Sequence, residues 1–440
     1  MFTTTLSEFE TNIDNATTIN WETEFAPLKT LLSSLMDLAD ETATSQAVTD
    51  VGETFDDILE TNSVLITEDV IKTIVCTTID QFAGDVESGS DLEVIITNIK
   101  LAINEQAGLS YKTELTALNS LFENITDIDI DSANFYAEFG QLLDSYDATY
   151  GYYHSVVVSS VRPDIVKLVI NKVDTASMDS AMVTIVNKIK NNVDNLESID
   201  SATKYENEFT HIKEFVDSVN NLTSIDASTF NFTSFGVMLD GFGDSVLLKP
   251  IRKDVLNFVC DKVSDNLTGS TTEINTAITE ILTETKTMAD KAEQGLVTYE
   301  QIFTDLGKIK NLTFSLETVN ITRTDSGLAA IKTFGETLTE LKELSVVPLI
   351  AVVRIADYIT DAIVGDNGIK NIMPDNYESD AVLLEVYNTV IAEIQPIGLK
   401  YQTYLNNPDG SDFDFETDFE AIWQTVKNAD QALTNARFTR

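Results

Sequence analysis

The sequence predicts an all-α protein, a tandem array of four helical-bundle repeats of roughly 90 to 100 residues each, with a cap at either end. Two observations predict this class. Apolar residues recur at helical spacing behind an aromatic residue, and that pattern returns at a nearly constant interval along the chain. A second pattern, centred on a glycine, follows the first in each copy. Together they indicate one helical unit used four times.

The first element of each unit is a helix that opens at an aromatic residue. Apolar residues follow that aromatic four, seven and ten positions later in every copy, which places them on one face of a helix. The four aromatic residues, separated by 90, 94 and 94 positions, are Trp21, Tyr111, Tyr205 and Tyr299. We therefore expect an opening helix at the start of each unit.

The second element contains a glycine beside a hydrophobic stripe. Within a helix, glycine costs about 1 kcal/mol relative to alanine, so its return at the same place needs a physical reason. The pattern indicates either two helices that cross closely or a helix boundary. The glycines are Gly52, Gly140, Gly236 and Gly335.

The third element is a helix preceded by proline in three copies. Proline near a first turn costs little, because its missing N–H has no partner within the helix there. An aspartate early in such a helix suits the positive end of the helix dipole. The prolines are Pro163, Pro250 and Pro348, and the aspartates are Asp69, Asp164 and Asp254. Residues 155–161 are rich in valine, and we leave open a short strand or a helix end there.

The fourth element is a closing helix. Ser90 with Glu93, and Ser270 with Glu273, have the spacing of capping boxes that begin a helix. Glycine in the left-handed conformation commonly follows a helix end, and three copies place a glycine there. These are Gly108, Gly295 and Gly398. Tyr401 would begin a fifth unit, but Pro408 interrupts its pattern, so the last residues are expected to form a terminal cap.

The predicted boundaries follow the aromatic residues. Residues 1–20 form an N-terminal cap, and residues 401–440 form a truncated repeat or C-terminal cap. The four repeats between them are 21–110, 111–204, 205–298 and 299–400.

The charge balance restricts the partners. The chain has 72 acidic and 28 basic residues, a formal net charge of −44, while 43% of its residues are hydrophobic. It can therefore bury a core, and its acidic character predicts no binding to nucleic acid or to anionic membranes. The charge favours solubility, cations or a basic protein partner.

The first residues and the length of the apolar stretches predict a soluble protein, and the two cysteines predict buried thiols. The first residues lack the basic and apolar regions of a signal peptide, and no apolar stretch reaches the ~18 to 20 residues that span a bilayer. We expect a virion or cytoplasmic location. Cys76 and Cys260 each lie in an apolar run, which predicts two buried free thiols.

Residues for catalysis are scarce. The chain has two histidines, His154 and His211, and no nucleophile motif accompanies either. No phosphate-binding glycine loop, dinucleotide fingerprint or zinc-protease motif is present. The sequence thus predicts no catalytic residues, no cofactor and no enzymatic activity.

One stretch resembles a calcium-binding loop. Asp127, Asp129 and Asp131 stand at the first, third and fifth positions of such a loop, and Glu138 stands at the twelfth. Ser132 replaces the expected glycine, however, and the other copies lack the pattern. The alternative is a solvated turn whose aspartates cap the next helix.

The predicted function is that of a non-enzymatic structural or assembly protein. Stacked repeats produce a large regular surface, which suits binding and spacing more than chemistry. A component of a virion, such as a capsid- or tail-associated protein, or of another large particle fits best, with protein partners or self-assembly. The alternatives are an extracellular ligand-binding repeat array and a calcium-binding interaction protein.

Overall fold

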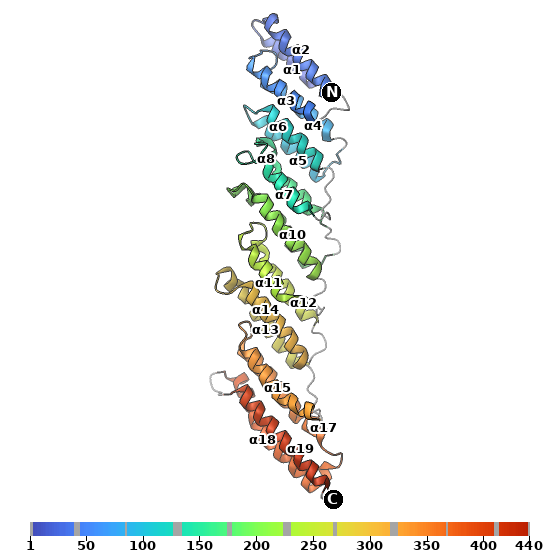
Figure 1. Ribbon diagram of the computed structural model, residues 1–440, viewed down its shortest axis with the longest axis vertical. Coiled ribbons are helices and arrows are strands. Elements are labelled where there is room, and N and C mark those ends of the chain that lie inside the picture. The colour runs from blue at the N-terminus through green and yellow to red at the C-terminus, as the bar shows by residue number, and fades with distance from the viewer. Residues whose placement is uncertain are drawn as a thin grey trace. The chain divides into compact units, whose positions relative to one another are not determined.

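The computed structural model describes residues 3–38, 45–83, 86–125, 134–173, 178–222, 230–266, 271–316, 324–366, 368–408 and 413–438. Every regular element within these ranges is a helix, which confirms the predicted all-α class (Figure 1). Two compact units divide the chain. One comprises residues 1–216 with 244–251, and the other comprises residues 217–243 with 252–440.

The first unit consists of two layers of helices. In one layer α3 packs between α2 and α6, and in the other α5 packs between α4 and α8, while α1 lies on α4. Figure 1 shows successive pairs of these helices, from α1 and α2 to α7 and α8, lying progressively farther from the N-terminal pair. The elements are α1 (Thr3–Asn15), α2 (Trp21–Leu38), α3 (Ser45–Glu60), α4 (Glu68–Ala83), α5 (Asp91–Glu105), α6 (Tyr111–Ile125), α7 (Phe135–Ser145), α8 (Val156–Asn171), α9 (Ser180–Asn192), the 3-10 helices η1 (Val193–Ser198) and η3 (Lys249–Ile251), and the start of α10 (Lys204–Leu222).

The second unit repeats the two-layer arrangement. The pairs α11 with α14 and α15 with α19 form one layer, and α12, α13, α16 and α18 pack successively in the other. The elements are α11 (Phe232–Gly241), η2 (Phe242–Asp244), α12 (Arg252–Asn266), α13 (Thr272–Glu293), α14 (Tyr299–Leu316), α15 (Asp325–Lys342), α16 (Leu349–Val364), α17 (Ile369–Ile372), η4 (Tyr377–Ser379), α18 (Ala381–Asn406) and α19 (Phe415–Phe438).

Four kinds of helix recur in the chain. We call α2, α6, α10 and α14 the opening helices, and α3, α7, α11 and α15 the glycine helices. The third helices are α4, α8, α12 and α16, and the closing helices are α5, α9, α13 and α18. Opening helices begin at or beside the predicted aromatic residues, and three of those residues, Tyr111, Tyr205 and Tyr299, are at most 1% exposed.

The recurring glycines mark close helix crossings. A Cβ atom added to Gly52 would lie 2.6 Å from the carbonyl oxygen of Tyr111 on the next opening helix. Added to Gly236, it would lie 2.6 Å from the carbonyl oxygen of Tyr299. Gly140 meets the start of α10 in the same way, at 2.7 Å from the Cα of Glu206. Of the two sequence interpretations, the close crossing is therefore confirmed.

The third helix of the second copy differs from its prediction. Residues 155–161 are neither a strand nor a helix end, because Ser155 is the N-cap of α8 and its Oγ accepts the N–H of Val158 at 2.9 Å. Pro163 therefore lies inside the helix, not in its first turn. The carbonyl that Pro163 leaves without its usual donor belongs to Ser159, and it accepts Nε of Arg162 at 3.3 Å instead. Asp164 likewise lies in the helix interior.

At the closing helices, two glycine helix ends and one N-cap are as predicted, and one N-cap differs. Gly108 and Gly295 adopt φ values of 69° and 72°, the left-handed conformation expected after a helix end. Ser90 caps α5 as predicted, by accepting the N–H of Glu93 at 3.2 Å. In the third copy the cap is Thr271, one residue later than predicted.

The C-terminal part corrects two further predictions. Gly398 is buried inside α18 and Tyr401 lies near the end of the same helix, so neither marks a boundary. Instead α19 packs on α15 as the opening helices pack on the other glycine helices. A Cβ atom added to Gly335 would lie 2.6 Å from Cβ of Phe419. α19 therefore resembles the opening helices in position and also begins at a buried aromatic residue, Phe415, which is 2% exposed.

Candidate functional site

The predicted calcium ligands are placed only in part. Asp127, Asp129 and Asp131 lie outside the described residues. Glu138 lies on α7, where its side chain is exposed and its N–H donates to the carbonyl of Asn134 at 3.1 Å. Across the described ranges, no group of three or more His, Cys, Asp or Glu residues is arranged to hold a metal. The calcium loop stays a prediction.

Histidines and cysteines lie in unrelated settings. His154 is exposed in the loop before α8, with a φ of 51°, and His211 lies half-buried on α10 with Nδ1 3.6 Å from Glu214. Cys260 is fully buried, and burial raises the pKa of its thiol to about 12. Cys76 is half-buried, and burial raises its pKa as well. A thiol of raised pKa is a poor nucleophile at neutral pH, so both cysteines act as small apolar residues.

Buried carboxylates bind the chain at or just before the start of each third helix. Glu114 on α6 is 3% exposed, and it accepts the hydroxyl of Ser155 and the N–H groups of Val156 and Val157 at 2.9 and 3.1 Å. These are backbone donors at the start of α8 that the helix itself leaves without partners. Burial raises the pKa of Glu114, although the three hydrogen bonds act to lower it. The carboxylate thus ties the opening helix to the third helix of its own copy.

The same bridge occurs in the other copies. Glu24 accepts from Ser63 and from the N–H of Val64 at 3.1 Å, and Glu208 accepts from Ser245 at 2.7 Å and from two backbone N–H groups. In the fourth copy Asp305 takes this place and accepts both donors of Ser345. The serines are each followed by valine, at Ser63-Val64, Ser155-Val156, Ser245-Val246 and Ser345-Val346.

A second set of carboxylates joins successive copies. Asp144 lies four residues after Gly140 and accepts the N–H groups of Tyr205 and Glu206 at 3.0 and 2.9 Å. Asp56 does the same for Tyr111 at 2.7 Å, and Asp240 for Tyr299 at 2.8 Å. Each glycine helix therefore caps the opening helix that it crosses. In the fourth copy the equivalent position is Thr339. There α19 is capped by the residue that immediately precedes it, Asp414, which accepts the N–H of Thr417 at 2.9 Å.

A buried arginine completes the junction in the second and third copies. Arg162 is 1% exposed, and its Nη2 lies 2.9 Å from carboxylate oxygens of both Asp147 and Glu197. Its guanidinium lies 4.9 Å from the ring centre of Tyr205, whose hydroxyl donates to Glu197 at 2.5 Å. Arg252 repeats the arrangement with Glu293 at 2.6 Å and the Tyr299 ring at 5.1 Å. These charges are paired with one another, which is the condition for burying them in a stable core.

Outside these junctions, Asp357 on α16 has a carboxyl group whose pKa is raised well above its usual value. Burial and the neighbouring charge of Asp361 raise the pKa of its carboxyl to about 6. Its Oδ1 is buried without a hydrogen-bond partner among the described residues. A raised carboxyl pKa is a feature of general acids, yet both carboxylates lie on one helix, and residues 352–366 around them contain no histidine, cysteine or serine.

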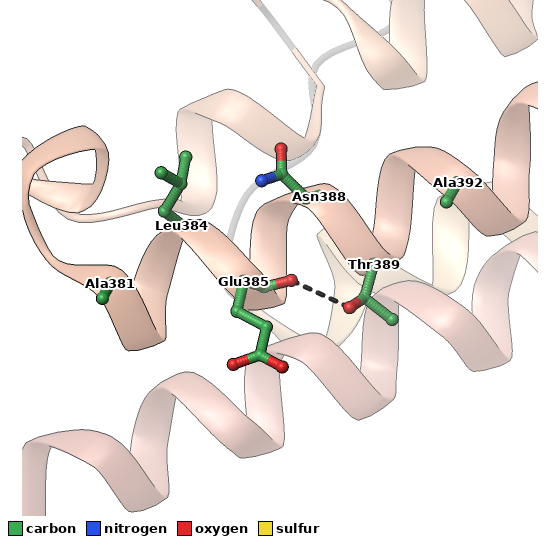
Figure 2. A pocket seen from close by; sticks show the side chains of 6 residues that line it. All are labelled: Ala381, Leu384, Glu385, Asn388, Thr389 and Ala392. Atoms are coloured by element: carbon green, nitrogen blue, oxygen red, sulfur yellow. Dashed lines mark hydrogen bonds between the residues drawn. The ribbon is translucent and has the colours of Figure 1, made fainter.

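A hollow runs along one face of α18, shown in Figure 2. Six side chains of that single helix line it, and the Oγ of Thr389 donates to the carbonyl of Glu385 at 2.8 Å, a bond within the helix. Only one lining residue is ionisable. A catalytic site needs groups that converge from several elements, and this open helix face does not supply them. The lining residues are Ala381, Leu384, Glu385, Asn388, Thr389 and Ala392.

Large apolar side chains lie exposed on α2. Trp21 is 46% exposed, Phe25 65%, Leu32 62% and Met36 75%. Their offsets of four, eleven and fifteen positions place them on one face of the helix. Scattered apolar residues are common on protein surfaces, but a row of four on one helix face is a candidate interaction surface. We call these four residues the α2 face.

Comparison of the chain with protein-family models, curated proteins and solved structures finds no match. In the described ranges no helix combines the length and apolar character required to cross a bilayer. The exposed apolar side chains make the α2 face the candidate site with the most support from geometry, and it is a surface and not a pocket.

The polar junctions were not predicted. The predicted repeat pattern includes the aromatic residues and the glycines, but neither the carboxylate three positions after the aromatic nor the aspartate four positions after the glycine. Both signals are present in the sequence, as Glu24, Glu114 and Glu208 and as Asp56, Asp144 and Asp240. The repeated Ser-Val pairs would also have located the segment that leads into each third helix, and in α8 the helix start itself.

Proposed function

We propose that this chain is a non-enzymatic structural or assembly protein that works through its helical surfaces, as a component of a large particle such as a virion. The observation that carries the proposal is the α2 face, because four large apolar side chains on one helix need a partner to leave water.

The use of the buried polar groups supports this function. Glu114, Asp144 and Arg162 are nearly inaccessible, and their hydrogen bonds go to helix ends, to one another and to buried tyrosine. A catalytic carboxylate needs contact with substrate, whereas these groups hold helices together. The internal polar framework is thus explained by architecture alone.

The charge specifies the chemistry of the partner. With a net charge of −44, the chain attracts basic surfaces and repels acidic ones. Association with a basic partner through exposed carboxylates weakens as salt screens the charges, with a screening length of about 8 Å at physiological ionic strength. Apolar contacts such as the α2 face are insensitive to that screening.

Sedimentation of the chain from its natural source tests the proposal. An extract is separated on a density gradient at low and at high salt, and the chain is followed with an antibody. The proposal predicts a fast-sedimenting particle at low salt, with partial release when the salt is raised. A chain that sediments at its own mass of 48.6 kDa under both conditions contradicts it.

A further inference from the structure

The α2 face is the first of a series whose other members are covered. Phe25 is 65% exposed, while Leu115 and Phe303, at the same position in α6 and α14, are 3% and 0% exposed. Trp21 is 46% exposed, while Tyr111 and Tyr299 are 1% and 0% exposed. The difference lies in what precedes each opening helix. A glycine helix packs on α6 and α14, and no described helix of that kind precedes α2.

The covering helices share one sequence pattern. Relative to the glycine, apolar residues occur four and one positions before and three positions after, and an aspartate follows at the fourth position in three copies. The glycine brings the backbones together, and the apolar residues fill the space on either side of it. The pattern is Val48, Val51, Gly52, Phe55 and Asp56 in α3, and Phe232, Phe235, Gly236, Leu239 and Asp240 in α11.

A second copy of this chain has no uncovered glycine helix among its described residues that could pack on the α2 face. Within the described residues the glycine face of each glycine helix is already covered by another helix. α6 packs on α3, the start of α10 meets α7, α14 packs on α11, and α19 packs on α15. Because α19 covers α15, the array cannot continue from the end of one copy to the α2 face of another. Packing two α2 faces together would bring into contact two chains that each have a net charge of −44, and electrostatic repulsion opposes that contact.

We propose that the α2 face binds a glycine-bearing amphipathic helix of a different polypeptide, which takes the place that a glycine helix takes on α6, α10 and α14. This inference rests on the proposed assembly function and names its partner by chemistry. The partner presents a small residue to the start of α2 near Trp21, with apolar residues one position before and three positions after it.

The aspartate of the pattern is dispensable at α2. In the internal junctions that aspartate accepts the first N–H groups of the opening helix, as Asp56 does for Tyr111 and Lys112. At α2 the side chain of Asn20 already accepts the N–H of Glu22 at 3.2 Å. The glycine and the apolar positions therefore decide binding.

The chain supplies both the reporter and the probe for a test. It has two tryptophans, so Trp423→Phe leaves Trp21 as the only indole and its emission reports burial of the α2 face. The probe is a synthetic peptide of residues 324–343, which contains α15 and Gly335. Short helices are marginal in water, so a lactam between the side chains of Ala329→Lys and Thr333→Glu holds the peptide helical. Both positions are exposed in α15. Lys332 is left unchanged, because it pairs with Glu420 of α19 at 3.0 Å.

The expected result is a saturable shift of Trp21 emission to shorter wavelength when the peptide is added to the full chain. A peptide with Gly335→Leu should bind at least tenfold more weakly, because the larger side chain separates the two backbones. Phe25→Ser in the chain should remove binding, whereas Val237→Ser should leave it unchanged. Phe25 and Val237 are both exposed, at 65% and 50%, so neither substitution disturbs a core.

Three outcomes overturn the inference: no emission shift with a peptide whose circular dichroism is helical, equal binding of the Gly335→Leu peptide, or peptide-free dimerisation that Phe25→Ser abolishes. The last outcome would assign the face to a second copy of this chain. The sedimentation experiment is independent of all three. If the chain enters a large particle but does not bind the peptide, this inference is wrong and the proposed function still stands.

Discussion

Alanine at Gly236 should destabilise the protein, although alanine is the better helix former. The added Cβ would lie 2.6 Å from both the carbonyl oxygen of Tyr299 and the Cα of Glu300. Both are backbone atoms of α14, so no side-chain rotation relieves the overlap and the two helices must separate. That separation also pulls Asp240 from the N–H groups that it accepts.

The size of the effect follows from two opposing contributions. Helix propensity favours alanine by about 1 kcal/mol. Overpacking costs about 1 to 3 kcal/mol, and rigid backbone contacts place this site at the upper end. The net destabilisation is therefore about 2 kcal/mol, which lowers the melting temperature by about 4 to 8 °C for a unit of this size.

A matched control lies on the same helix. A Cβ added to Gly241 meets nothing within 4 Å, and that position is exposed. Gly241→Ala should therefore leave the melting temperature unchanged or raise it slightly. Scanning calorimetry of the full chain compares both variants with the parent. If Gly236→Ala melts at or above the parent, close crossing at the glycine is not what joins these helices.

Three further predictions concern charged groups. Glu114→Gln should cost about 2 kcal/mol in urea unfolding, because one of the two acceptor oxygens becomes an NH2 group that faces buried donors, while the exposed Glu123→Gln should change stability by under about 0.5 kcal/mol. Arg162→Ala should cost about 3 to 5 kcal/mol, because it leaves buried carboxylates unpaired, and a loss under about 1 kcal/mol would refute the network. The pKa of Asp357 is raised from 3.8 to about 6 by burial and by Asp361, so its stabilising contribution is complete below pH 3.8 and is lost as the pH rises through 6. Asp357→Asn should accordingly raise the melting temperature at pH 7.5, by an amount that vanishes near pH 4, and a gain that grows on acidification would contradict this sign.

The sequence predicts the fold class because the relevant signals are local. An aromatic residue followed by apolar residues at helical spacing specifies an opening helix within about three turns of chain. Gly108 and Gly295 mark helix ends by a conformation that other residues rarely adopt. These features need no knowledge of distant contacts.

The junctions escape prediction because their partners are distant in sequence. Asp144 and Tyr205 are 61 residues apart, and Glu114 and Ser155 are 41 apart, so no local window contains both. The start of α8 was misplaced for the same reason, since Ser155 and the distant Glu114 together accept the first N–H groups of a helix that begins at Val156, before Pro163. The α2 face escaped because Trp21 and Phe25 carry the same pattern as their buried counterparts, and only the arrangement of helices shows them uncovered.

Site-specific photo-crosslinking in the natural source tests the central claim most directly. A photoreactive phenylalanine analogue replaces Phe25, and in a control it replaces Val237, which is exposed on α11. The account predicts a crosslink from position 25 to one other protein, at a helix with a glycine or another small residue beside the attachment point, and no such product from position 237. A product that joins two copies of this chain, or equal labelling from both positions, would contradict it.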